Sequence, residues 1–253
     1  MVDENHAGRP YYRTMEAREF ALRIREVVPA DVIVNKVVVH LPSRGAFARW
    51  ARETTVERAI HNYVLVGGTS SLRHYPGPGV LEACGILSHL FRSRGIEEGL
   101  AGTIAIPARP GEAERLFAKT LAGSRFATTQ ILFDTESLRE FLPAYVHLCE
   151  EFEVPPATLV ISVAPVSDAH DLEFVRWLGA DVPDVVEDRL FHEGPEAAKN
   201  QSIKLAMTLW KEILALRRSR RLRIPLGLNV EQVSHHNLDA AVEMAGALSS
   251  LLD

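Results

Sequence analysis

Residues 159–164 read LVISVA, a run that is apolar over almost its whole length and lacks a clean polar alternation. A strand that is covered on both faces has this pattern, as in a parallel sheet under helices. Helical patterns flank the run, over Ser137–Glu151 before it and Asp171–Leu178 after it. This order of helix, strand and helix is typical of an α/β fold.

The same alternation extends along the chain in both directions. Further strands are expected at Val32–Leu41, Tyr63–Gly68, Gly102–Ile106, Phe126–Phe133 and Ile224–Glu231. Further helices are expected at Thr14–Val27, Ala46–Ala59, Val80–Arg92, Glu112–Leu121, Ala197–Arg218 and His236–Leu252. Such alternation predicts a parallel sheet with right-handed crossovers. Six strands fit an open doubly wound sheet, whereas a closed (β/α)8 barrel needs two more, so the pattern alone leaves both open.

Length and composition indicate one soluble globular domain over residues 1–253. The chain is 47% hydrophobic and 24% charged, which excludes a disordered or fibrous protein. A net charge of −5 argues against a nucleic-acid partner, and no apolar run is long enough to cross a membrane. Cys84 and Cys149 have no partner at a metal-binding spacing. We therefore expect reduced, buried thiols and a cytoplasmic protein.

Polar residues lie near the ends of several predicted strands. Ligands bind at the carboxyl ends of parallel strands in either architecture, so these residues are site candidates. The candidates are His40, Gly68, Thr69, Thr129, Gln130, Asn229 and Glu231.

Each candidate also has a structural interpretation. Gln130 interrupts an apolar strand, and its amide suits either the edge of a pterin or neighbouring backbone. Glu231 could bind ring N–H groups, act as an acid, or cap a helix. His40 is either catalytic or a histidine at the edge of the core. His235 and His236 lack a third ligand at a metal-binding spacing, so no metal site is expected.

Residues 119–134 read KTLAGSRFATTQILFD and resemble a K-x-x-A-G-A…T-Q-x-x-F-D block of the methylenetetrahydrofolate reductase family. Supporting pieces are His40-Leu41, Leu65–Thr69, Ala164–Val166, Trp177–Pro183 and Gly227–Asn229. The resemblance implies an incomplete TIM-barrel-like fold whose six strands correspond to strands three to eight of the barrel. It also implies an oxidoreductase of folate one-carbon metabolism. Such an enzyme passes a hydride from NAD(P)H, through FAD, to 5,10-methylenetetrahydrofolate and gives 5-methyltetrahydrofolate.

The resemblance assigns roles to individual residues. Gln130 matches the glutamine that contacts the folate pterin, while His40 and Lys119 match positions that line the flavin. The family's R-G-D strand end reads Gly67-Gly68-Thr69 here, so Thr69 replaces an aspartate beside the pterin and flavin. We expect Gly68 to contact the cofactor, and Thr69, Thr129 and Asn229 to contact the substrate.

The family's opening strand, which carries a catalytic glutamate, has no counterpart, and Glu231 is the candidate replacement acid. The lost flavin positions favour direct transfer from NAD(P)H over an FAD enzyme. The alternatives are a folate-dependent methyl transferase and a non-catalytic folate-binding subunit. We expect the gap left by two strands to be closed by a second copy, another subunit or the Thr14–Val27 helix. A homo-oligomer or a partner subunit is therefore expected.

Overall fold

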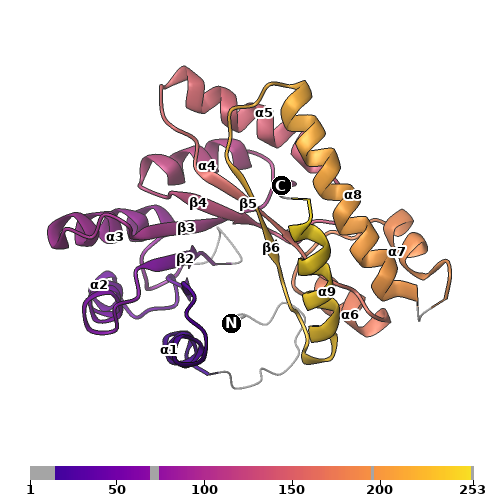
Figure 1. The fold of residues 1–253 in the computed structure, drawn as a ribbon. Helices are drawn as coiled ribbons and strands as arrows, with labels where there is room; N and C mark the ends of the chain where they lie inside the picture. Colours follow the sequence, from indigo (N-terminus) through magenta and orange to yellow (C-terminus); the bar gives the residue numbers. More distant parts are fainter. Residues whose placement is uncertain (1–14, 69–73, 195–196, 252–253) are drawn as a thin grey trace. The chain divides into compact units, whose positions relative to one another are not determined.

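Parallel strands alternate with helices in the part of the chain that the structure, a computed structural model, describes: residues 15–68, 74–194 and 197–251 (Figure 1). The strands of this part are β1 (Ile33–Val37), β2 (Asn62–Val66), β3 (Leu100–Ala105), β4 (Phe126–Thr129), β5 (Thr158–Val163) and β6 (Leu226–Val230). Each strand neighbours the next along the chain, in the order β1-β2-β3-β4-β5-β6. Parallel pairing sets Ile33 opposite Asn62, Tyr63 opposite Ala101 and Leu159 opposite Leu226.

This strand order decides between the two architectures that the sequence leaves open. A doubly wound sheet reverses direction at a switch point, so its strand order departs from the chain order. A barrel adds each strand beside the one before it. The observed order is that of a barrel segment, and it confirms the α/β class with six parallel strands.

The helices follow the predicted alternation with one addition. They are α1 (Ala17–Val27), α2 (Arg44–Arg52), α3 (Val80–Arg94), α4 (Glu112–Leu121), α5 (Glu136–Glu151), α6 (Ala169–Trp177), α7 (Asp184–Phe191), α8 (Ala198–Ser219) and α9 (Leu238–Ser249). Helix α7 is not predicted by the sequence pattern. The predicted Ala46–Ala59 helix is instead α2 followed by a π-helical turn, η1 (Glu53–Glu57), and a short 3-10 turn at His235–Asn237 precedes α9.

Strands β1 and β4 each end four residues before the predicted end. Strand β1 ends at Val37 instead of Leu41, because the chain turns and the Leu41 N–H donates to the Val38 carbonyl at 3.3 Å. Strand β4 ends at Thr129 instead of Phe133. There the Gln130 side-chain oxygen accepts the Ile131 N–H at 3.0 Å, which takes the place of a ladder bond. Gln130 therefore lies just beyond β4.

The chain divides into two compact units. The first contains residues up to Ile104 together with Glu114–Ala127, and the second contains Ala105–Ala113 and the residues from Thr128 onward. Strands β3 and β4 each begin in the first unit and end in the second. The expectation of one domain over residues 1–253 stays a prediction.

In the first unit, α2 and α3 pack against the strands through aromatic and aliphatic side chains such as Phe47, Trp50 and Phe91. Tyr63 of β2 is fully buried among them, and its hydroxyl pairs with the Thr55 hydroxyl at 2.8 Å. Burial raises the pKa of Tyr63 to about 12. Helix α1 belongs to the same core through Ala21.

The second unit has a core of its own at the carboxyl ends of β4 and β5. Ile131 and Phe133 pack there with Val166, under side chains of α6 and α7 such as Val175 and Leu190. These apolar contacts fix the segments that follow β4 and β5. The polar side chains beside these segments therefore have a rigid support.

Both cysteines are free and buried, as expected. Burial raises the pKa of Cys84 to about 12, so its thiol is not a nucleophile at neutral pH. In the described part of the chain, no helix combines the length and the apolar character that a bilayer crossing requires.

Candidate functional site

Four polar side chains of the second unit form a connected cluster at the carboxyl ends of β4, β5 and β6. Asn229 of β6 donates from Nδ2 to Ser162 Oγ and to Glu231 Oε1, both at 3.1 Å. The Ser162 N–H donates to Thr129 Oγ1 at 2.9 Å. The backbone N–H of Glu231 extends the ladder by donating to the Val163 carbonyl at 2.8 Å. Side chains of β5 and β6 thus hold the carboxyl group of Glu231, and Thr129 of β4 holds the backbone of Ser162 beside it.

The surroundings of Glu231 favour its protonated form. Burial raises the pKa of the carboxyl group, and the hydrogen bonds from Ser162 and Asn229 offset only part of that effect. The side chain remains partly accessible to solvent. A half-buried carboxyl group with a raised pKa at the end of a parallel strand is suited to donate a proton.

Gln130 lies half-buried immediately after β4. Its Nε2 donates to the Leu178 carbonyl at 3.1 Å, and its Oε1 accepts the Ile131 N–H. Gly179, next to Leu178, has a φ of +89°, and a Cβ there would lie 3.5 Å from Gln130 Nε2. Gln130 therefore does bond to neighbouring backbone, as its structural interpretation predicts. These two bonds hold the amide in one orientation, and they do not involve its second N–H.

Thr129 and Asn229 have different positions in the cluster. The Thr129 side chain is 2% exposed, and its oxygen is occupied by the Ser162 N–H. Thr129 therefore fixes the strand ends and offers little surface to a ligand. Asn229 is half-buried and orients Glu231 through one donor.

The cofactor candidates of the first unit are in contact with protein groups. The His40 ring lies 5.6 Å from the Tyr75 ring, centroid to centroid. A Cβ added at Gly68 would lie 2.3 Å from the same tyrosine ring. Tyr75 therefore fills the position in which a Gly68 side chain would stand, while Gly68 itself is exposed. Thr69 lies outside the described residues.

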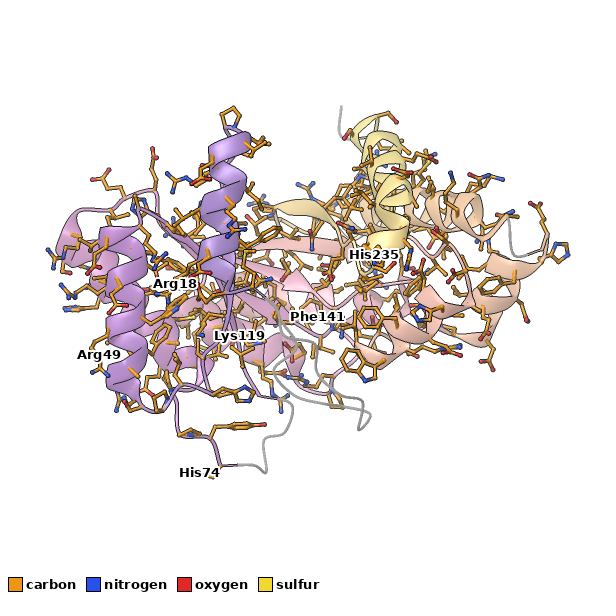
Figure 2. The ribbon with its side chains drawn as sticks, turned by 90° about the horizontal axis from the view of Figure 1, so that it is seen from below. Arg18, Arg49, His74, Lys119, Phe141 and His235 are labelled. Carbon is orange, nitrogen blue, oxygen red and sulfur yellow. The ribbon has the colours of Figure 1, made fainter. Side chains whose placement is uncertain are left out.

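Lys119 of α4, labelled in Figure 2, is half-buried in the first unit. Its Nζ donates to the Ile104 carbonyl near the carboxyl end of β3, at 2.7 Å. The ammonium group is thus held at a strand end, the position at which the sequence predicts a cofactor contact.

The residues that come nearest to a metal-binding arrangement in the described ranges are Asp168, His170 and Asp171, whose ligand atoms lie within 4.8 Å of one another. Their oxygens serve the fold. Asp168 caps α6 by accepting the Asp171 N–H at 2.8 Å, and Asp171 accepts from Ser167 N and Ser234 Oγ. These hydrogen bonds account for the close approach of the two carboxylates without a metal ion.

Part of the chain is similar to a known protein family. Residues 108–232 match the family model of methylenetetrahydrofolate reductase. The chain resembles the methylenetetrahydrofolate reductases. The match includes β4, β5 and β6, and with them the whole cluster around Glu231. No curated protein sequence matches the chain.

A solved structure shares the fold over nearly the whole chain. It is an uncharacterized protein from Clostridium thermocellum that binds two copies of 5-methyl-5,6,7,8-tetrahydrofolic acid. The TM-score is 0.76 at 21% identity, and the match covers 94% of this chain and 79% of the other. A second structure, KGPDC from Streptococcus mutans, reaches a TM-score of only 0.35 at 11% identity, with 85% and 97% of the two chains covered.

The reductase family implies a flavin, and the described candidates do not form an open cradle for one. Tyr75 occupies the position beside Gly68 in which a Cβ would stand. His40 packs on the same ring, and Lys119 is bonded to a carbonyl. These candidate residues therefore do not fit a bound FAD.

Ser162 and Tyr75 are the members of these two clusters that sequence reasoning missed. Ser162 is the single polar residue of the LVISVA run, and it is fully buried. A lone hydroxyl group inside an apolar strand must find hydrogen-bond partners, which is the signal that could have identified it. The signal for Tyr75 is weaker, because an aromatic residue in a Gly- and Pro-rich loop has many structural explanations.

Proposed function

We propose that this protein binds a reduced folate and reduces 5,10-methylenetetrahydrofolate to 5-methyltetrahydrofolate with a hydride from NAD(P)H. The observation that carries the proposal is the half-buried carboxyl group of Glu231, whose pKa is raised at the end of β6. The family match over residues 108–232 supports the substrate class. So does the fold shared with a protein that binds 5-methyl-5,6,7,8-tetrahydrofolic acid.

In the proposed reaction, Glu231 donates a proton to the folate nitrogen whose bond to the bridging methylene group breaks. The lone pair of the other bridge nitrogen then forms an iminium with that carbon. A hydride from the nicotinamide ring adds to the carbon, which yields the methyl group and NAD(P)⁺. Asn229 orients Glu231, and Gln130 binds the pterin edge through the amide that Leu178 holds in place.

Folate binding is tested first, by calorimetric titration with 5-methyltetrahydrofolate. We expect micromolar binding by the wild type and at least tenfold weaker binding by Gln130→Ala, which corresponds to about 1.4 kcal/mol. Gln201→Ala is the matched control, because Gln201 of α8 bonds to Glu193 far from the cluster along the chain. Unchanged thermal unfolding shows that a variant is folded. Absence of binding by the wild type would contradict the proposal.

Hydride transfer is tested separately, by oxidation of NADH or NADPH in the presence of 5,10-methylenetetrahydrofolate. We expect Glu231→Gln to lower the turnover rate by about 10²-fold or more and to retain binding of 5-methyltetrahydrofolate, because only proton donation is lost. Equal rates in wild type and variant would remove Glu231 from the chemistry.

A non-catalytic folate-binding protein is the second candidate. The observation in its favour is that the fold neighbour is described only by the ligand it binds, two copies of 5-methyl-5,6,7,8-tetrahydrofolic acid. Binding without nicotinamide oxidation would favour this function or a methyl transferase. The calorimetric stoichiometry then shows whether this chain takes one folate or two.

We further propose a cytoplasmic protein that associates with a second copy. In the described residues, β1 pairs only with β2 and β6 only with β5. Edge strands with free backbone groups attract pairing with other chains unless they are covered. Helix α1 contacts the core beside β1 and protects part of the first unit. Light scattering after size exclusion tests the proposal, and a monomer at all concentrations would contradict it.

A further inference from the structure

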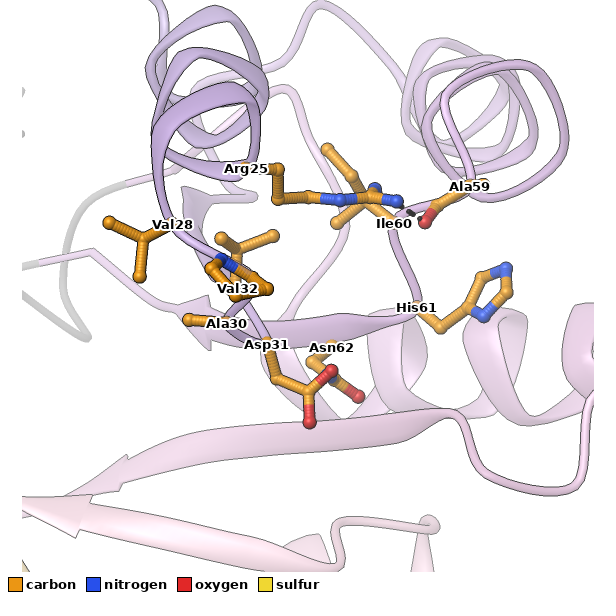
Figure 3. A pocket seen from close by; sticks show the side chains of 10 residues that line it. Arg25, Val28, Ala30, Asp31, Val32, Ala59, Ile60, His61 and Asn62 are labelled. Carbon is orange, nitrogen blue, oxygen red and sulfur yellow. Dashed lines mark hydrogen bonds between the residues drawn. The ribbon is translucent and has the colours of Figure 1, made fainter.

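A pocket of about 290 Å³ lies at the amino ends of β1 and β2 in the first unit. It is lined by the end of α1, the segment before β1 and the segment before β2, including Arg25, Asp31, Ile60, His61 and Asn62 (Figure 3). The predicted folate site belongs to the carboxyl ends of strands, so this pocket lies outside it. Nothing in the proposed reaction uses these residues.

Arg25 is held in place on one side of the pocket. Its Nη1 donates to the Ala59 carbonyl at 3.0 Å and to the Arg58 carbonyl at 3.4 Å. Ala59 has a φ of +48°, in the left-handed region that a non-glycine residue seldom adopts. The guanidinium group is thus fixed by backbone carbonyls and keeps its remaining N–H groups for another partner.

The charged groups of the pocket have no counterions among the described residues. Arg25 contacts only the two carbonyls, and Asp31 has no hydrogen bond or ion pair there. Figure 3 shows the guanidinium group of Arg25 and the carboxylate of Asp31 on different sides, with His61 on a third side. Val28 and Val32 supply apolar surface around them, above the buried Ile60.

We propose that this pocket binds a short linear zwitterion of the ω-amino-acid type. The ligand's carboxylate pairs with Arg25, its ammonium group pairs with Asp31, and its methylene chain contacts Val28 and Val32. A planar guanidinium group suits a carboxylate through paired N–H donors. Because the two protein charges lie on different sides, a ligand whose charges are several bonds apart matches them better than an α-amino acid.

The test is a ¹⁵N NMR titration with 5-aminopentanoate at low ionic strength, with the full chain. The ligand makes only two charge contacts, and both are accessible to solvent, so we expect a dissociation constant on the order of 1 mM. The amide signals of Asp31, His61 and Asn62 should shift. Pentanoate lacks the ammonium group and pentylamine lacks the carboxylate, so each should bind at least tenfold more weakly. Equal shifts with all three compounds, or no shifts with 5-aminopentanoate, would overturn the proposal.

Variants separate the pocket from general charge effects. Asp31→Asn removes one charge while keeping the side-chain shape and should weaken binding at least tenfold. Arg25→Gln should do the same, but it also removes the bonds to the Arg58 and Ala59 carbonyls, so Asp31→Asn is the decisive variant. Arg23→Gln, on the same helix outside the pocket, is the control. Asp31→Asn should leave 5-methyltetrahydrofolate binding unchanged, so failure of this inference is distinguishable from failure of the proposed function.

Discussion

At the residue scale, the raised pKa of Glu231 makes the stability of the protein depend on pH. A carboxyl group whose folded-state pKa exceeds its ordinary value of 4.5 binds protons more tightly when folded. The protonated carboxyl group therefore makes its whole contribution to the free energy of unfolding below pH 4.5. That contribution is lost as the pH rises through the folded-state pKa.

Glu231→Gln mimics the protonated carboxyl group, so it should not show this loss. We expect the variant to be as stable as the wild type at about pH 4 and more stable at about pH 7, as measured by urea unfolding at each pH. Glu173→Gln is the control, because Glu173 is exposed on α6. A variant that is less stable at neutral pH would show that the ionised carboxylate is the favoured form.

The backbone at Gly77 approaches a neighbouring segment too closely for a side chain. A Cβ there would lie 2.3 Å from the Val38 carbonyl oxygen and 2.8 Å from that of Val39. Because both contacts are to backbone, Gly77→Ala must push two segments apart, and we expect a loss of about 1–3 kcal/mol in unfolding free energy.

Gly85→Ala is the matched control for Gly77→Ala. Gly85 lies inside α3, and a methyl group there would meet open space, since nothing beyond the helix's own backbone lies within 4 Å of its Cβ position. Alanine in a helix is favoured over glycine by about 0.5–1 kcal/mol, so this variant should be more stable than the wild type. Equal effects of the two substitutions in denaturant unfolding would contradict the close approach at Gly77.

The chain sequence identifies some of these residues and not others. Gln130 and Glu231 are detectable because a polar group interrupts or ends an apolar run. The connection between Ser162 and Asn229 spans 67 positions, so only the parallel pairing of β5 and β6 reveals it. Likewise, the desolvation of Glu231 depends on atoms that the linear sequence does not place nearby.

At the element scale, two arginines of α1 bind the first unit beside the small apolar contacts of Ala17, Ala21 and Leu22. Arg18 lies over the Trp50 ring at 5.4 Å from its centroid and donates to Thr54 Oγ1 at 3.4 Å. Arg25 binds the carbonyls beside β2. Apolar anchoring is limited, because Phe20 and Val27 are exposed.

Arg18→Ala should therefore loosen α1. We expect faster hydrogen exchange over Ala17–Val27, with a loss of about 1 kcal/mol in stability, because a cation–π contact, a hydrogen bond and an ion pair with Glu53 are removed. Arg23→Ala, an exposed position on the same helix, should leave the exchange rates unchanged. Unaltered exchange in Arg18→Ala would mean that apolar packing holds the helix.

Periodicity predicts most elements well and their ends less well. The bounds of α4 are the predicted Glu112–Leu121, because a regular apolar face spans the helix. Helix α7 escapes prediction, since it is one of the shortest helices and its apolar residues, such as Val186 and Leu190, are interspersed with acidic ones. Strand β4 is shorter than predicted because a side chain, Gln130, takes over a backbone hydrogen bond.

At the scale of the whole molecule, the two units are interleaved in sequence. The chain leaves the first unit after Ile104, returns at Glu114 and leaves again after Ala127. Neither unit is a continuous segment, and β3 and β4 contribute to both. We therefore expect one cooperative thermal transition, in which the calorimetric and van't Hoff enthalpies agree. Two separated transitions would show independent domains.

The interleaving also constrains how the protein can acquire its structure during synthesis. Residues 105–113 emerge from the ribosome before the rest of the second unit exists, and the Ala105 carbonyl then lacks the Gln130 N–H that it later accepts at 2.9 Å. The first unit is likewise unfinished until Ala127 has been translated. A nascent chain halted between these points has strand edges without their later partners, so we expect slow translation across residues 105–130 to increase the aggregated fraction of the product.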